Sequence, residues 1–294
     1  MSRSLRGVVI ALSLAALSPA ASHGQAGNGA AWDSVGRVLQ TPAVFGGGYY
    51  RYNLPRRDLT VRVADVTVAP ELALGAWAGF SGEAAEATMM GDLVLTGAEL
   101  RPVLAELARQ HIEVTAIHNH LVGEEPRLIY VHVHGHGRAT ALASRLDHAI
   151  ALTGTPRPVA VASPTPLTID TTAVFAALGR SGRARGAVAQ LSFILVPGTV
   201  TMSGMTVVPA LGYGSPVNVQ KVGADRIVAT GDFAVSGARV DPLLQALAAR
   251  GILATAVHSH MVDESPKVYF IHFWADGAQK ATLEGLKAAI DAGR

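Results

Sequence analysis

Apolar positions along the chain follow two spacings, one typical of strands and the other typical of helices. Four segments have the β-branched content or the alternation of strands, namely residues 59–68, 88–95, 112–120 and 127–134. Residues 97–110 and 138–152 repeat apolar side chains three and four positions apart, which predicts amphipathic helices. The order strand, helix, strand, strand, helix is that of a split β-α-β, or ferredoxin-like, unit. We therefore expect an α+β fold.

The same pattern occurs twice. Residues 91–150 align without a gap with residues 231–290, at a constant offset of 140, and 22 of the 60 aligned pairs are identical. Weaker similarity upstream extends the first repeat over residues 30–151 and the second over residues 168–293. Residues 152–167 carry four prolines and are predicted to be a linker. The fold expected is two tandem ferredoxin-like repeats, with their sheets packed face to face or joined into a closed barrel.

The N-terminal segment has the pattern of a secretory signal peptide. Arg3 and Arg6 precede an apolar run over residues 7–17, and small residues surround Pro19. That run is too short to cross a bilayer, which takes ~20 apolar residues. We predict that residues 1–25 are a signal peptide. The mature protein is then exported to the periplasm or the extracellular space, without stable insertion into the membrane.

Composition excludes several kinds of chemistry. Hydrophobic residues make up 49% of the chain and charged residues 16%, as in a globular protein. Lys and Arg number 24 against 22 Asp and Glu, and no basic cluster could follow a phosphate backbone, so no nucleic acid partner is expected. Cysteine is absent, which excludes disulfides, thiolate metal ligands, cysteine nucleophiles and a lipid anchor on cysteine.

Histidine is the most informative residue type. Eight of the eleven histidines fall in or just beyond the two predicted strand pairs of the repeats, namely His118, His120, His132, His134, His136, His258, His260 and His272. Because side chains alternate across a strand, the two histidines of each His-x-His pair share one face. Antiparallel pairing with His118 opposite Tyr130 places both pairs of the first repeat on the same side of the sheet. Val131 and Val133 then face the helices.

A glutamate follows the first His-x-His pair of each repeat by four residues. Neutral imidazoles beside a carboxylate, with one position left open, suit a divalent metal ion, above all zinc or iron. The candidate ligands are His118, His120, Glu124, His132, His134, His136, His258, His260, Glu264 and His272. Trp274 and Asp276 replace His134 and His136 in the second repeat, so the two copies are not equivalent.

Two glycine-containing motifs carry weaker signals. Gly91-Asp92 and Gly231-Asp232 are predicted to form turns or polar contacts that enter a strand, with each aspartate a further candidate ligand. Gly46-Gly47-Gly48, followed by tyrosines, predicts a turn into an aromatic-rich strand.

These residues leave more than one function open. A bound metal ion would support a metal-dependent hydrolase or oxygenase that acts on a small molecule. Alternatively, the histidines line the cleft of a non-catalytic module for a cell-envelope ligand, a glycan or a peptide, or only satisfy one another in a core between sheets. Cupins also combine His-x-His with a nearby glutamate, but cupins are all-β and the predicted helices argue against that fold.

The motifs together resemble one family. The residues concerned are Met90-Gly91-Asp92, Glu113 to Leu121, Glu124-Glu125-Pro126-Arg127, His132 and Gly135-His136-Gly137 in the first copy, with Gly48-Tyr49-Tyr50 and Trp77-Ala78-Gly79-Phe80 upstream and His272-Phe273-Trp274-Ala275 in the second copy. They are similar to the DUF1259 family, also called LppY/LpqO, over nearly the whole mature chain. This resemblance implies duplication and export and indicates no substrate. The lack of cysteine departs from the lipoprotein members and implies a freely soluble form.

Overall fold

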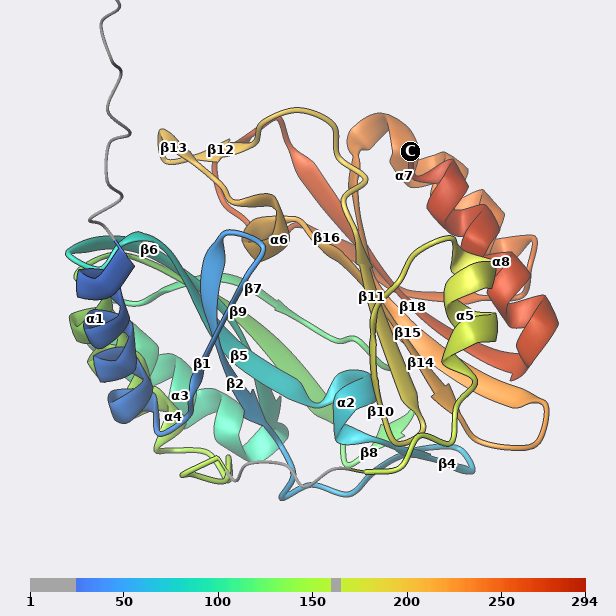
Figure 1. Ribbon diagram of the computed structural model, residues 1–294, viewed down its shortest axis with the longest axis horizontal. Coiled ribbons are helices and arrows are strands. Elements are labelled where there is room, and N and C mark those ends of the chain that lie inside the picture. The colour runs from blue at the N-terminus through green and yellow to red at the C-terminus, as the bar shows by residue number, and fades with distance from the viewer. Residues whose placement is uncertain (1–24, 160–164) are drawn as a thin grey trace, which may run out of the picture.

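The computed structural model describes residues 25–159 and 165–294, which form two similar halves. Each half has one six-stranded antiparallel sheet with helices on its outer side, and the two sheets face each other across the middle of the molecule (Figure 1). The predicted α+β fold with two tandem copies is confirmed. Among the described residues the strands do not close into a barrel, so face-to-face sheets are the arrangement found. The predicted signal peptide lies outside the described residues, apart from Gln25.

The first sheet has the strand order β1-β2-β5-β6-β9-β7. Its strands are β1 (Ala43–Gly46), β2 (Tyr49–Pro55), β5 (Gly75–Glu83), β6 (Glu86–Thr96), β9 (Leu128–Gly137) and β7 (Glu113–His118). The helices of this half are α1 (Gln25–Leu39), α3 (Gly97–Arg109) and α4 (Ala139–Ile150). β9 lies between β6 and β7 and is antiparallel to both, so β6-α3-β7-β9-α4 is the predicted split β-α-β unit.

The second sheet repeats this order as β10-β11-β14-β15-β18-β16. Its strands are β10 (Arg183–Arg185), β11 (Val188–Phe193), β14 (Ser215–Lys221), β15 (Arg226–Ser236), β18 (Val268–Ala278) and β16 (Leu253–His258). Its helices are α5 (Thr171–Leu178), α7 (Gly237–Ala248) and α8 (Gln279–Ala292). Asp170 caps α5, because its carboxylate accepts a hydrogen bond from the backbone N–H of Ala173 at 3.0 Å.

The segment predicted as one strand over residues 59–68 is a hairpin. β3 (Val61–Val63) pairs with β4 (Val66–Val68), and the turn contains Ala64 with a φ of 51°. The valines shift from odd to even positions across this turn, which a single strand with one buried face does not do. A third short strand, β8 (Glu124–Glu125), pairs with β3. The second half has the equivalent small sheet, formed by β12 (Thr201–Met202), β13 (Met205–Thr206) and β17 (Glu264–Ser265).

Each half extends a short arm onto the sheet of the other half. The first arm runs through β4 to the one-turn helix α2 (Pro70–Ala73). The Gln220 side chain accepts a hydrogen bond from the Ala69 N–H and donates one to the Thr67 carbonyl, both at 2.9 Å. Asn218 donates to the Leu72 carbonyl at 2.8 Å. Backbone groups of the first arm are thus satisfied by side chains of β14.

The second arm ends in α6 (Pro209–Gly212) and packs through apolar contacts instead. Leu211 belongs to one buried cluster with Tyr49 and Met90 of the first half. Gly79 of β5 makes room for this arm, since a Cβ at that position would press against the Leu211 side chain. Each half has a larger apolar core of its own between its sheet and its helices. The smaller cluster contains residues of both halves and therefore joins them. No helix in the described part of the chain is long and apolar enough to span a bilayer.

The glycine before each buried aspartate tests this packing. A Cβ at Gly231 of β15 would collide with the carbonyl oxygen of Pro216 on β14. Neither backbone can move without disturbing the sheet, so we expect Gly231→Ala to lower the free energy of unfolding by about 1–3 kcal/mol or more in chemical denaturation. Gly97→Ala is the matched control, because nothing lies within 4 Å of its added methyl group. Equal stability of the two variants would contradict the close approach of β14 and β15.

Candidate metal centre

Six of the predicted ligands gather between the two sheets, three from each half. They are His118, His120 and His132 from the first half and His258, His260 and His272 from the second. The predicted register is confirmed, since His118 lies opposite Tyr130, and the second half repeats it with His258 opposite Phe270. The inner faces of the two sheets therefore bring the histidines of both copies into one cluster.

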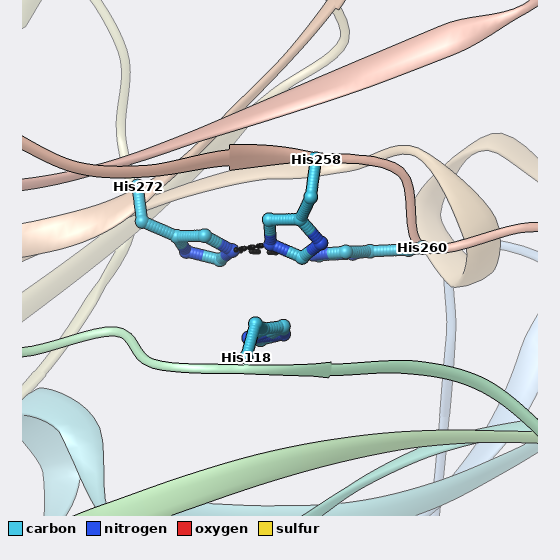
Figure 2. A group of neighbouring side chains, drawn as sticks. All are labelled: His118, His258, His260 and His272. Atoms are coloured by element: carbon cyan, nitrogen blue, oxygen red, sulfur yellow. Dashed lines mark hydrogen bonds between the residues drawn. The ribbon is translucent and has the colours of Figure 1, made fainter.

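The imidazole nitrogens approach one another most closely in the second half. Nε2 of His272 lies 2.8 Å from Nε2 of His258 and 3.3 Å from Nε2 of His260 (Figure 2). His118 faces this trio from the first half, with its ring centre 4.1 Å from that of His258. One nitrogen from each of the four lies within 4.8 Å of the others. Ligands about 2.0–2.1 Å from a tetrahedral zinc ion lie ~3.4 Å apart, and the nitrogen separations here lie on both sides of that value, so the group could hold a single ion.

The remaining two histidines, His120 and His132, each contact a histidine of the other half. The ring of His132 stacks on that of His260, with 3.7 Å between the ring centres. The ring centres of His120 and His272 lie 4.0 Å apart. These two contacts are equivalent under the offset of 140 that relates the repeats. His120 also belongs to two further groups with metal-ligand spacing, one with His118 and His132 and one with Asp232 and His272. The cluster thus offers more donors than one tetrahedral ion needs.

Two aspartates border the cluster, and the structure corrects the prediction for their segments. Gly91-Asp92 and Gly231-Asp232 lie inside the long strands β6 and β15, with Asp92 opposite His132 and Asp232 opposite His272. Oδ1 of Asp232 lies 2.7 Å from Nδ1 of His272, although the two atoms are not aligned as a hydrogen bond. A carboxylate on the Nδ1 side leaves Nε2 directed at the other histidines, which is how carboxylates commonly orient metal-binding imidazoles.

Burial leaves much of the cluster without hydrogen bonds. Both ring nitrogens of His118 are buried and unsatisfied, as are Nε2 of His120, Nε2 of His132 and Oδ1 of Asp92. Each unsatisfied buried group costs about 1–3 kcal/mol. A neutral imidazole nitrogen without its proton is a lone-pair donor, so a bound cation would satisfy several of these atoms at once.

The surroundings hold five histidines of the cluster in the neutral form that metal binding requires. Burial, and then the charge of neighbouring imidazoles, lowers the pKa of four histidines far below the ordinary value; these are His118, His120, His132 and His260. The same causes lower the pKa of His258 to about 4. Burial and the nearby charge of Asp232 raise the pKa of Asp92 well above its usual range. Imidazoles kept unprotonated near pH 7 are ready to act as ligands.

The structure does not bring the two predicted glutamate ligands together with the histidines. Oε1 of Glu124 accepts a hydrogen bond from the Leu128 N–H at 3.1 Å, and Oε1 of Glu264 accepts one from the Val268 N–H at 3.2 Å. Ser259 also donates to Glu264, at 2.8 Å. Neither glutamate belongs to the groups with metal-ligand spacing found among the described residues. Through these hydrogen bonds the two carboxylates stabilise the loops between the strands that carry the histidines.

The two extra histidines of the first copy also lie apart from the cluster. His134 is buried on the same strand as His132, but its Nδ1 contacts Oε2 of Glu113 at 2.7 Å. His136 is partly exposed, with its Nδ1 3.9 Å from Oε1 of Glu86. The repeat that is richer in histidine therefore contributes no more of them to the centre than the other does.

The stacking of aromatic rings on the histidines was not predicted from the sequence. Tyr130 stacks on His120 with 3.9 Å between the ring centres, and Phe270 stacks on His260 with 3.6 Å between the ring centres. The sequence did contain a signal for this stacking, because Tyr130 precedes His132 by two residues and Phe270 precedes His272 by two residues, which places each aromatic on the same strand face as that histidine. A cavity of about 790 Å³ opens onto the cluster and is lined by residues of both halves, among them His120 and Trp77. A small molecule that entered this cavity would reach the histidines.

Fold and site together define a duplicated α+β protein with one histidine-rich centre shared by its two copies. The family described as Domain of Unknown Function (DUF1259) matches the chain twice, over residues 33–152 and 172–292, and the chain belongs to this family. No curated protein matches the chain. Among solved structures, the double-ringed trimeric shell protein MSM0271 from the RMM microcompartment is 8% identical, with 71% of this chain and 83% of that chain covered. Its TM-score of 0.18 is too low to support any argument.

The lowered histidine pKa values predict how stability depends on pH. In the metal-free protein these histidines are neutral, whereas in the unfolded chain they bind protons below about pH 6.5. Unfolding therefore takes up protons, and stability is lost as pH falls. We expect the Tm measured by circular dichroism in EDTA to drop between pH 7 and pH 5. The raised pKa of Asp92 acts in the opposite direction, but it is one group against five.

The matched variant for this experiment is His260→Phe, which removes one buried imidazole and keeps an aromatic ring against Phe270. Its Tm should depend less steeply on pH than that of the wild type. A Tm that stays constant or rises on acidification would contradict neutral buried histidines.

Proposed function

We propose that this protein binds a divalent metal ion, zinc or iron(II), between its two repeats and acts on a small molecule as a metal-dependent hydrolase or oxygenase. The observation that supports the proposal is the convergence of the Nε2 atoms of His258 and His260 on that of His272 within 3.3 Å, with unsatisfied His118 opposite. Several buried imidazoles whose nitrogens converge on one point are an arrangement typical of metal ligands.

The chemistry of the donors narrows the metal. Imidazole suits zinc, iron, copper and nickel, whereas calcium and magnesium prefer oxygen ligands. Zinc would lower the pKa of a bound water to ~7 and so supply a nucleophile near neutral pH. His120 and His132 line the cavity beside the converging nitrogens and are placed to serve as a further ligand or as a general base.

We further propose that the protein works outside the cytoplasm. Arg3, the apolar run over residues 7–17 and the small residues after it support export through a cleaved signal peptide. A site built from histidine and aspartate, in a chain without cysteine, also suits an oxidising compartment. N-terminal sequencing of protein recovered from the periplasm or the medium should find the chain beginning near residue 26, and an intact Met1 would contradict this.

Metal content tests the centre directly. We expect about one or two zinc or iron ions per chain in untagged protein, measured by elemental analysis after reconstitution. His272→Gln should lose at least about tenfold in metal affinity, because His272 belongs to two of the groups with metal-ligand spacing. His148→Gln is the matched control, since His148 is exposed on α4. Wild-type protein that stays free of metal after reconstitution would refute the proposal.

Glu264 separates a role in metal binding from a role in folding. Glu264→Ala removes the acceptor for the Val268 N–H and for Ser259, so we expect it to lower the free energy of unfolding by about 1–3 kcal/mol. Metal stoichiometry in the folded variant should stay at the wild-type value. Loss of metal without loss of stability would instead make Glu264 a ligand, as its spacing in the sequence suggested.

A second candidate function is a non-catalytic module that binds a cell-envelope ligand, a glycan or a peptide. The observation in its favour is that the lining of the cavity extends past the histidines to Tyr49 and Trp77. Ligand binding that survives EDTA, in a protein that takes up no metal, would favour this function over the first.

A further inference from the structure

The lining of the cavity carries an excess of positive charge. Five arginines line the cavity, namely Arg51, Arg57, Arg180, Arg183 and Arg185, against the acidic residues Glu71, Asp92 and Asp232. The two aspartates lie with the histidines. Glu71 forms ion pairs with two arginines, since its Oε1 lies 2.7 Å from Nη2 of Arg57 and 3.5 Å from Nε of Arg185. The lining therefore has five guanidinium groups against three carboxylates, and the charge of Asp92 acts on Arg51.

Arg51 is the arginine most firmly positioned to receive an anion. Its guanidinium carbon lies 4.2 Å from the ring centre of Trp77. Nε donates to Oδ1 of Asn53 at 2.8 Å, and Nη1 donates to the Tyr49 hydroxyl at 3.4 Å. These contacts use two of the five N–H donors of an arginine. Among the described residues no carboxylate lies within ion-pair distance of Arg51, and Asp92, whose charge acts on Arg51 from farther away, pairs with His120 and His132.

Arg183 brings a second positive charge from the other half of the molecule. It lies in β10, and its Nε donates to Oε1 of Gln190 at 3.1 Å. Gln190 in turn donates to the Glu71 carbonyl of the first half at 2.8 Å, so the contact between the halves fixes this part of the wall. Burial lowers the pKa of Arg51. The contact with Tyr49 and the charge of Asp92 oppose this shift, and the charge of Arg183 adds to it. Arg51 and Arg183 line the same cavity, and two like charges in one cavity favour an anion bound between them.

We infer that the cavity binds a small anionic molecule, with a carboxylate or phosphate group held by Arg51 and Arg183 and the rest of the molecule extending toward the histidine cluster. The planar guanidinium matches the paired oxygens of either group. Trp77 and Tyr49, which also line the cavity, offer apolar surface to the body of the molecule.

This inference deepens the proposed function and rests on it in one respect, which is that the bound anion is the substrate of the metal centre. Binding of the anion itself requires only the arginines. The consequence is a substrate with two ends, one an oxyanion recognised at the wall and the other a reactive group at the histidines. Uncharged envelope glycans lack the first of these features.

The test is anion binding to the full mature chain after EDTA treatment. Inorganic phosphate and acetate are titrated by calorimetry at constant ionic strength into wild type, Arg51→Gln and Arg183→Gln. We expect the affinity for at least one of the two anions to fall about tenfold or more in Arg51→Gln and severalfold in Arg183→Gln. Arg57→Gln is the matched control, because Arg57 lines the same cavity but is paired with Glu71, and its affinity should stay within about twofold of wild type.

The outcomes separate this inference from the proposed function. Equal affinity in wild type and Arg51→Gln would overturn the inference, as would binding that appears only with zinc present and ignores both variants. If Arg51→Gln fails to fold, Arg183→Gln alone decides, because Arg183 is exposed and its loss leaves the core intact. Anion binding that depends on arginine, in a chain that never takes up metal, would sustain the inference while the metal proposal fails.

Discussion

The arrangement of the whole molecule depends on the exchange of arms between its two halves. β14 side chains satisfy the backbone of the first arm, and the apolar second arm is buried against Tyr49 and Met90. These contacts hold the inner faces of the sheets at a distance where imidazole rings from opposite halves touch. A half without its partner would leave three histidines in water, where they would titrate normally and bind a metal ion weakly.

The sequence predicted the local geometry of the site well, because strand alternation and a short hairpin loop determine it. The pairing of His118 with Tyr130 follows from those two facts, and it places the histidines on the inner face. The approach of His118 to His258 could not be predicted, since it depends on how two sheets pack. The prediction of Glu124 as a metal ligand rested on its spacing from His120, four residues earlier. Its carboxylate instead accepts a hydrogen bond from the backbone N–H of Leu128, four residues later.

The number of histidines in a repeat proved a poor guide to its contribution. The strand pair of the first copy has two more histidines than that of the second, yet His134 contacts Glu113 and His136 is partly exposed, so both lie away from the cluster. The tightest approach of nitrogens occurs in the second copy, where Asp232 stands behind His272. What distinguishes the centre is therefore the direction of the side chains and their burial, which alternation along a strand specifies only within one sheet.

Because the centre takes donors from both copies, the chain resembles a two-fold dimer whose subunits have been joined covalently. In a dimer of identical subunits, any substitution changes both sides of the centre together, and the donors on the axis must stay equivalent. A fused chain is free of that restriction, since each half carries its own residues. Three converging nitrogens on one side and a single facing imidazole on the other is an arrangement that strict symmetry forbids. One half can then specialise in holding an ion while the other shapes what reaches it.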